Sequence, residues 1–389
     1  MDRNLAIMII SAALSSLSSS IYIYQARFYA TQEGFDYGVQ SIYEVYSYAV
    51  SIFLVLGAGF LSDVLGRRFF TFLAYFLGFV SASSLALLPS WVGFPLSIIL
   101  YNSAFALVIV ARNVLVIDLA GPLTARWLGY IMTASSIFMV VGPIAGSTFR
   151  EWLGYRGLFT LLSILWLMAS ISFLYIDEPR ARINRSNASI PTPEEILGFI
   201  ASLRNLWPIT LYSCIDRFSF YLWMPLISAY FSEKGFSDSE VAILYAVQNL
   251  TWFLGSYAFG LLAESRAIYV LALSEALTGL SALAMSINPV PGALAPYISF
   301  ILMGASIASW IPSYNAILGS LVTSHARGGL YSTIYVLATV AGLPAPYIGS
   351  MIRSLFGGEA HFLASFAIST SNALFLLLFI KKRYEIQAR

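Results

Sequence analysis

The chain has 389 residues, of which 59% are hydrophobic and only 10% are charged. A soluble domain carries about 25% charged residues, so this composition excludes an ordinary soluble protein and predicts a polytopic membrane protein. The net charge of +2 gives no reason to expect nucleic acid as a partner, and the single cysteine excludes an intramolecular disulfide. The two histidines lie far apart in the sequence, so we expect no metal site, no cofactor and no enzyme activity.

A transmembrane helix needs about 20 mainly apolar residues. The sequence predicts an all-α membrane protein with twelve such helices: 5–29, 38–62, 69–89, 94–120, 127–149, 156–177, 206–231, 239–262, 266–287, 292–320, 329–352 and 360–380. The first segment could be a signal peptide, but its length and its polar end favour a helix that is retained.

Lysine and arginine predict the orientation, because they gather in cytoplasmic loops. With the N-terminus inside, only four lie on the outer side: Arg150, Arg156, Lys234 and Arg353. Fourteen lie on the inner side: Arg3, Arg67, Arg68, Arg126, Arg180, Arg182, Arg185, Arg204, Arg266, Arg327, Lys381, Lys382, Arg383 and Arg389. We therefore expect a multi-pass protein of the cell (plasma) membrane with both termini in the cytoplasm.

The longest connection divides the predicted helices into two halves. It is rich in charged residues, proline, asparagine and serine, which predicts a cytoplasmic linker at 179–205 between a six-helix bundle at 1–178 and a second bundle at 206–389. An offset of 201 residues places Gly34 on Gly235, Arg126 on Arg327 and Pro143 on Pro344. These coincidences predict two halves related by a parallel repeat.

Residues 57–68 form the most specific motif of the chain. Gly59, Leu61, Asp63 and Gly66 are followed by Arg67 and Arg68. This string resembles the loop between transmembrane helices 2 and 3 of major facilitator superfamily transporters, whose pattern is Gly-x-Leu-Ala-Asp-x-x-Gly-Arg-Arg/Lys. Ser62 replaces the usual alanine. The resemblance implies two six-helix bundles around a central cavity and alternating access by a rocker switch.

The same resemblance implies a cytoplasmic gate. In the family fold Asp63 would face the N-terminus of helix 11, where a carboxylate is stabilised by about 0.3–1 kcal/mol. By symmetry Glu264 would face the start of helix 5, and Asp118 would join the charges near Asp63. The alternative is a tight turn with the positive charge that any cytoplasmic loop carries.

A second motif falls on the fifth predicted helix. Gly142, Pro143 and Gly146 resemble the Gly-x-x-x-Gly-Pro-x-x-Gly element of drug/proton antiporters, although Phe138 stands at its first glycine. Small residues beside a proline let a helix bend and pack closely. The motif favours export, and the alternative is a generic kinked helix.

Charged side chains within predicted helices are the candidates for function, since a charge at mid-bilayer costs at least about 2.5–3.5 kcal/mol. Asp216 and Arg217 lie near the centre of the seventh helix, and Arg112 lies in the fourth. Asp216 is the main candidate for proton coupling, with a structural salt bridge to a partner such as Arg112 as the alternative.

Glu44 is the second candidate for proton coupling, and Arg27 lies at a similar predicted depth, so a structural Arg27–Glu44 pair is the alternative. Glu275 lies at mid-depth in the ninth helix, which is peripheral in the family fold, and we expect it to bond a neighbour or to be protonated in place. Arg27, Arg112 and Arg217 are also candidates to contact substrate.

Polar and aromatic side chains of several predicted helices complete the candidate cavity, because aromatic walls suit amphipathic or cationic ligands. Interfacial aromatic belts are the alternative for this set: Tyr22, Tyr24, Gln25, Tyr43, Tyr46, Asn102, Trp223, Tyr245, Gln248, Asn249, Trp252, Trp310, Tyr314 and Asn315.

The leading functional prediction is secondary active export of a small amphipathic organic compound, driven by protons, by a monomer in a lipid bilayer. The first alternative is proton-coupled uptake of a metabolite such as a sugar or organic anion, which the arginines would suit. The second is a membrane receptor on the same fold that transports nothing.

Overall fold

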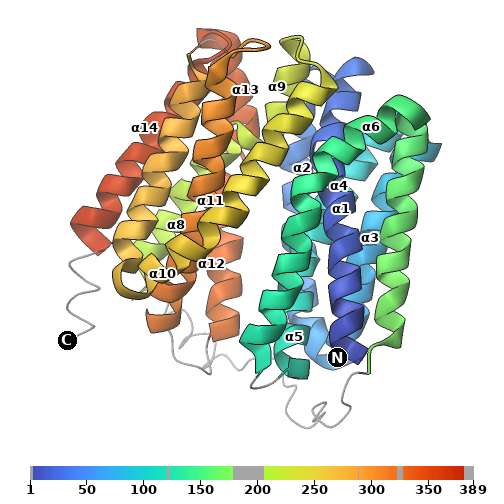
Figure 1. Cartoon of the computed structure of the whole chain (residues 1–389). Helices are drawn as coiled ribbons and strands as arrows, with labels where there is room; N and C mark the ends of the chain where they lie inside the picture. The colour runs from blue at the N-terminus through green and yellow to red at the C-terminus, as the bar shows by residue number, and fades with distance from the viewer. Residues whose placement is uncertain (1–2, 121–122, 178–205, 288, 322–326, 381–389) are drawn as a thin grey trace. The chain divides into compact units, whose positions relative to one another are not determined.

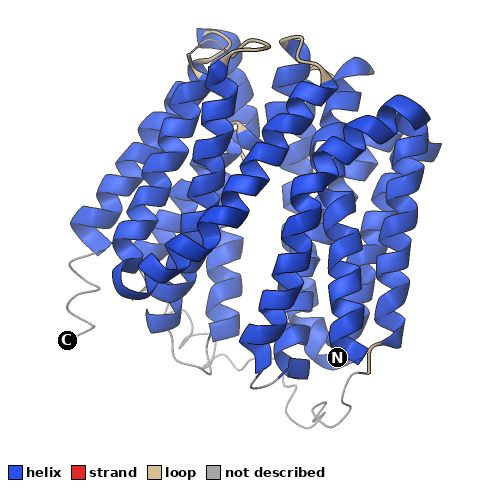
Figure 2. Cartoon of the chain, in the orientation of Figure 1, coloured by secondary structure: helices blue, strands red, loops and turns tan. Residues whose placement is uncertain are grey.

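The structure is a computed structural model that describes the chain except for residues 1–2, 121–122, 178–205, 288, 322–326 and 381–389. Every regular element in the described part is a helix, and it contains no strand (Figure 2). Eight of the described helices are long and apolar enough to cross a membrane. The prediction of an all-α membrane protein is therefore confirmed at the level of fold class.

The chain forms two compact units. Unit 1 comprises Met1–Ile190 together with Phe231–Glu233 and Asp238–Ala246, and unit 2 comprises Pro191–Tyr230, Lys234–Ser237 and Val247–Arg389. The predicted linker at 179–205 lies outside the described residues, so the predicted domain boundaries stay predictions.

Unit 1 is built around contacts of α1 and α3 with the long helix α6 (Figure 1). Its elements are α1 (Arg3–Gln32), α2 (Tyr37–Leu65), α3 (Arg67–Leu87), α4 (Ser90–Leu107), the π-helical turn η1 (Val108–Arg112), α5 (Asn113–Ala120), α6 (Thr124–Ser172) and the 3-10 turn η3 (Phe173–Tyr175). Gly66 precedes α3 with φ 93°, a conformation that glycine adopts without strain, and so allows the tight turn from α2.

Unit 2 is arranged around α8, which packs against α12 and α14. Its elements are α8 (Trp207–Tyr221), the 3-10 turn η5 (Met224–Leu226), most of α9 (Ile227–Glu233), most of α10 (Asp238–Met285), α11 (Leu294–Leu321), α12 (Arg327–Gly342), α13 (Ala345–Phe356), α14 (Ala360–Phe375) and the π-helical turn η6 (Leu376–Ile380). Gly349 of α13 lies directly on the backbone of Leu222, so this end of α8 has no room for a side chain at position 349.

The two longest helices each contain a break that the hydropathy pattern predicts as a loop. α6 has 49 residues, and a straight helix of that length would measure about 74 Å against a bilayer core of about 30 Å. Gly154 interrupts it with φ 66° and ψ 177°, and Arg266 interrupts α10 with φ −138° and ψ 38°. Each helix therefore has the length of two membrane crossings.

The predicted repeat has a structural counterpart in both units. Gly34 and Gly235, which coincide at the offset of 201 residues, both adopt positive φ after a helix, 93° and 82°. Ser81 of α3 donates a hydrogen bond to the Ser97 carbonyl of α4 at 2.9 Å, and Ser281 of α10 donates one to the Ser299 carbonyl of α11 at 2.9 Å. A pair of serines therefore joins two consecutive helical segments in each unit.

Candidate functional site

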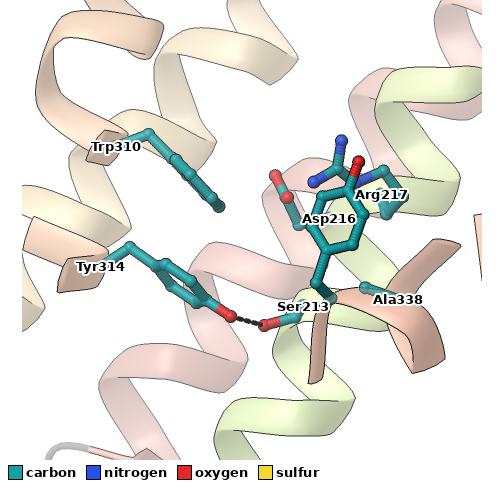
Figure 3. Close-up of a pocket in the computed structure, with 7 residues that line it drawn as sticks. Ser213, Asp216, Arg217, Trp310, Tyr314 and Ala338 are labelled. Carbon is teal, nitrogen blue, oxygen red and sulfur yellow. Dashed lines mark hydrogen bonds between the residues drawn. The ribbon is translucent and has the colours of Figure 1, made fainter. Parts of the chain in front are cut away.

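Unit 2 contains a small pocket between α8, α11 and α12 (Figure 3). Its lining residues come from these three helices: Ser213, Asp216, Arg217, Trp310, Tyr314, Tyr335 and Ala338. Asp216, Arg217, Trp310 and Tyr314 are four of the residues that the sequence predicts for proton coupling or substrate contact. The pocket thus brings together an acidic group, a basic group and aromatic rings from three helices.

Arg217 is held among aromatic rings. Its guanidinium carbon lies 5.4 Å from the centre of the Tyr221 ring and 5.5 Å from that of Tyr335, which is the range of cation–π attraction. A Cβ atom at Gly342 of α12 would lie 2.8 Å from Cγ of Arg217, so the glycine makes room for the arginine. The Nε atom is buried and has no hydrogen-bond partner in the described part of the chain.

Trp310 and Tyr314 form the aromatic wall of the pocket. They stand one turn apart on α11, and their rings stack with centres 4.5 Å apart and planes 15° apart. The Tyr314 hydroxyl and the Ser213 hydroxyl of α8 share a hydrogen bond of 2.9 Å, drawn in Figure 3. This bond ties the wall to the helix that carries Asp216.

Asp216 has an acidic neighbour, Glu275, that does not line the pocket. Its carboxyl group lies within interaction distance of that of Glu275, in the part of α10 that follows the break at Arg266. Glu275 is fully buried, and its Oε1 atom accepts a hydrogen bond of 2.8 Å from the Tyr212 hydroxyl. Sequence reasoning did not place Glu275 at the site, because the ninth predicted helix is peripheral in the family fold. The sequence signal that could have identified Glu275 as a site residue was a carboxylate at mid-depth in a predicted helix.

Unit 1 holds the other predicted acidic candidate in a closed ion pair. Arg27 binds Oε1 of Glu44 through Nε at 2.7 Å and also through Nη2, and both side chains are buried. Oε2 of Glu44 accepts a hydrogen bond of 3.0 Å from the Asn102 amide, which also donates to Ser47 at 2.6 Å. Both carboxylate oxygens therefore have partners, as expected of a structural pair.

Gln25 joins a second polar cluster of unit 1, at the start of α10. Its amide donates to Oδ1 of Asp238 at 2.8 Å, and Nε of Arg150 lies 3.3 Å from Oδ2 of the same aspartate. Tyr24 stacks on Tyr245 with ring centres 5.6 Å apart. Asp238, which directly precedes the predicted helix at 239–262, was not among the residues that the sequence predicted for the site.

The remaining cavity candidates lie in varied surroundings. The Tyr22 ring is buried in the core of unit 1, stacked on Tyr101 with centres 4.3 Å apart. Trp223 is buried and donates through Nε1 to the Ser365 hydroxyl of α14 at 3.1 Å. Gln248 and Asn249 are buried in α10, and Arg112 ends the π-helical turn η1, a type of turn frequent at functional sites.

The predicted cytoplasmic gate is described only in part. The side chains of Asp63 and Asp118, and the surroundings of Gly59, lie outside the described residues. Arg67 and Arg68 begin α3, where Arg68 donates to the Leu174 carbonyl, and Glu264 is exposed.

The glycines of the predicted motif in α6 make a close helix contact. A Cβ atom at Gly146 would lie 2.5 Å from Cγ2 of Ile21, and one at Gly142 would overlap the Ser20 hydroxyl. The carbonyl of Pro143 between them accepts a hydrogen bond of 2.6 Å from the Tyr24 hydroxyl. The motif therefore lies directly on α1.

Comparison with known proteins agrees with this architecture. Residues 5–346 match the family described as Major Facilitator Superfamily. The chain is similar to the multi-drug resistance efflux pump PmrA of two strains of Streptococcus pneumoniae, with 22% identity over 330 residues, covering 82% of this chain and 80% of the pump.

Two solved structures share the fold at low sequence identity. One is a POT family transporter in complex with a thioalcohol conjugated peptide, with a TM-score of 0.76, 14% identity and coverage of 98% of this chain and 96% of the other. The second is a D-xylose–proton symporter, with a TM-score of 0.71, 14% identity and coverage of 97% of both chains.

Proposed function

Because the chain belongs to the Major Facilitator Superfamily, it is a multi-pass membrane transporter rather than an enzyme, and we propose that it exports small amphipathic organic compounds in exchange for protons. The proposal includes twelve transmembrane helices in two six-helix bundles, both termini in the cytoplasm, location in the plasma membrane, a monomeric state and rocker-switch alternating access.

One observation carries the proposal: Asp216 lines the same pocket as the Trp310–Tyr314 wall. A flat apolar compound can stack on that wall, while the adjacent carboxyl group either holds a proton or attracts a positive group on the ligand. Proton binding and substrate binding at neighbouring atoms compete, and competition of this kind is what exchange requires.

The direction of transport is supported by similarity. PmrA is a multi-drug resistance efflux pump, and the glycines of the α6 motif resemble those of drug/proton antiporters. The Arg27–Glu44 pair narrows the choice of proton site, because both oxygens of Glu44 already have partners. Asp216 is therefore the main proton site of the proposal, and Glu44 the secondary one.

Proton-coupled uptake of an organic anion is the second candidate function, and Arg217 is the observation that favours it. Its guanidinium lines the pocket, and its buried Nε atom has no hydrogen-bond partner in the described part of the chain. An anionic group on a ligand would satisfy that donor and would gain a charge-assisted hydrogen bond.

Transport in proteoliposomes with an imposed pH gradient separates these functions. We expect the cationic dye ethidium to move against the proton flow, whereas co-movement of the anionic dye fluorescein with protons would favour anion uptake. Asp216→Asn should abolish the dependence on the gradient. Asp177→Asn is the matched control, because Asp177 is an exposed carboxylate paired with Arg3 outside the pocket.

Equal gradient-driven flux in wild type and Asp216→Asn would remove Asp216 from the coupling mechanism. No gradient-driven flux of either dye, together with binding of one of them, would favour the non-transporting receptor.

A further inference from the structure

Glu275 is a buried acid whose described surroundings contain no ion-pair partner. It is 0% exposed in the part of α10 that follows the break at Arg266, and the Tyr212 hydroxyl donates to its Oε1 atom at 2.8 Å. Its Oε2 atom has no hydrogen-bond partner among the described residues. The donors that approach this carboxylate, the Tyr212 hydroxyl and the Asn372 amide, are both neutral. A buried carboxylate without a positive neighbour is costly, so we expect Glu275 to hold or share a proton.

Asp216 is the neighbouring acidic side chain that can share a proton with Glu275. Tyr212 and Asp216 are four residues apart on α8, so they share the face of that helix that meets Glu275. The two carboxyl groups lie within interaction distance of each other. Two adjacent carboxylates repel each other, whereas one proton between them removes the repulsion and provides the missing donor.

The other polar groups around the pair do not neutralise it. Arg217 attracts the Asp216 carboxylate electrostatically but forms no ion pair with it among the described residues, and its guanidinium lies over the rings of Tyr221 and Tyr335. Tyr314 contacts Ser213, and the Asn372 amide of α14 donates to the Tyr212 carbonyl at 3.2 Å. These groups are neutral, apart from an arginine that is engaged with aromatic rings.

We infer that Asp216 and Glu275 together form one proton-binding site, in which a single proton is shared between the two carboxyl groups. Asp216 is the member that lines the pocket, and Glu275 is the fully buried member that does not line it. A proton moves from pocket water to the Asp216 carboxylate, forms a hydrogen bond to Glu275 and leaves by the reverse path. The use of this shared site in transport rests on the proposed function, whereas the sharing of the proton does not.

The infrared carbonyl stretch of protonated carboxylic acids tests the shared site without a substrate. Purified full-length protein in nanodiscs is titrated with acid and base, and deuterium exchange identifies the band. We expect wild type to show a buried carboxylic acid band that the double variant Asp216→Asn, Glu275→Gln lacks. In each single variant the pH midpoint of the band should move by about one unit or more, a tenfold change in proton affinity.

Glu359→Gln is the matched control, because it removes a carboxyl group in the connection before α14, and it should leave the midpoint unchanged. Tyr212→Phe provides a second route if Glu275→Gln fails to fold, since it removes only the hydroxyl that binds Glu275, and it should also move the midpoint. Independent titration of the two acids, with the same midpoint in wild type and single variants, would overturn the shared site. Loss of the band on adding sodium chloride but not choline chloride would also overturn it, in favour of a metal cation.

The outcomes for site and function are separable. If the infrared midpoints move but Asp216→Asn transports normally under a pH gradient, the shared site stands and the proposed coupling fails. If Asp216→Asn loses coupling while the midpoints stay fixed, the coupling stands and the shared site fails.

Discussion

Arg27 binds Glu44 through Nε and Nη2 in the interior of unit 1, and Asn102 satisfies the second oxygen of the carboxylate. Removal of one member of such a pair leaves an uncompensated buried charge, which costs about 3–5 kcal/mol. We expect Glu44→Gln to lower the melting temperature strongly. The double variant Arg27→Gln, Glu44→Gln should recover part of the loss, as thermal unfolding in detergent would show. A double variant less stable than both single variants would contradict a structural pair.

Gly342 makes room for Arg217 in the pocket of unit 2. A Cβ atom would approach Cγ of Arg217 to 2.8 Å and the Tyr221 ring to 3.0 Å, so Gly342→Ala must displace the guanidinium. We expect about tenfold weaker binding of fluorescein, or about 1.4 kcal/mol, measured by fluorescence polarisation. Gly129→Ala is the control, since nothing lies within 4 Å of its added atom. Unchanged affinity in Gly342→Ala would remove Arg217 from the binding of anions.

Gly142 and Gly146 hold α6 against α1. Because an added methyl group at Gly142 would overlap the Ser20 hydroxyl and lie 3.3 Å from the Leu17 carbonyl oxygen, we expect Gly142→Ala to destabilise unit 1 by about 1–3 kcal/mol. Thermal unfolding of Gly142→Ala and of Gly129→Ala, on the same helix, measures the difference. Equal stability of the two variants would mean that the helices separate at this point without cost.

Glu359 and Lys234 form a partly exposed ion pair in the loops of unit 2, with an oxygen–nitrogen distance of 2.7 Å. The hydrogen bond from Lys234 holds the pKa of Glu359 below its usual range, with a further bond from the Tyr230 hydroxyl. A lowered pKa in the folded state means that the pair stabilises the protein above the unfolded pKa. That stabilisation is lost as the pH falls through the folded pKa.

We therefore expect Glu359→Gln to be slightly less stable than wild type at neutral pH, by at most about 1 kcal/mol because both side chains are partly exposed. The two proteins should converge in acid when their melting temperatures are compared along a pH series. A difference that stays constant down to low pH would show that packing, rather than the charge of Glu359, is responsible.

The sequence predicted where helical segments lie but not where they break, since the predicted spans 206–231 and 329–352 each appear as two helices, α8 and α9 and then α12 and α13. The predicted span 94–120 appears as α4, η1 and α5, which together cover Ser90–Ala120, and the predicted span 360–380 appears as α14 and η6. The loops predicted between 149 and 156 and between 262 and 266 are single breaks at Gly154 and Arg266. Hydropathy reports where the chain leaves the apolar phase, but it does not report whether the helix continues through the turn.

Long-range pairing was harder to predict than helix position. A structural Arg27–Glu44 pair was the predicted alternative to proton coupling by Glu44, because the two residues lie at similar predicted depth, and the structure brings them together. The sequence did not predict that Glu275 lies near Asp216, because the family resemblance places the ninth predicted helix at the periphery. Only the tertiary structure, in which the Tyr212 hydroxyl of α8 binds Glu275 of α10, places the two acids within interaction distance.

By itself the sequence determined that this is a membrane transporter built from apolar helices, because burial in lipid selects residue types locally and a short loop motif reports the family. Tertiary structure alone decided which polar groups meet inside it. A buried charge is stabilised by atoms a few ångströms away on other helices, such as those around Glu44 and Glu275, and helix packing rather than spacing along the chain sets those distances.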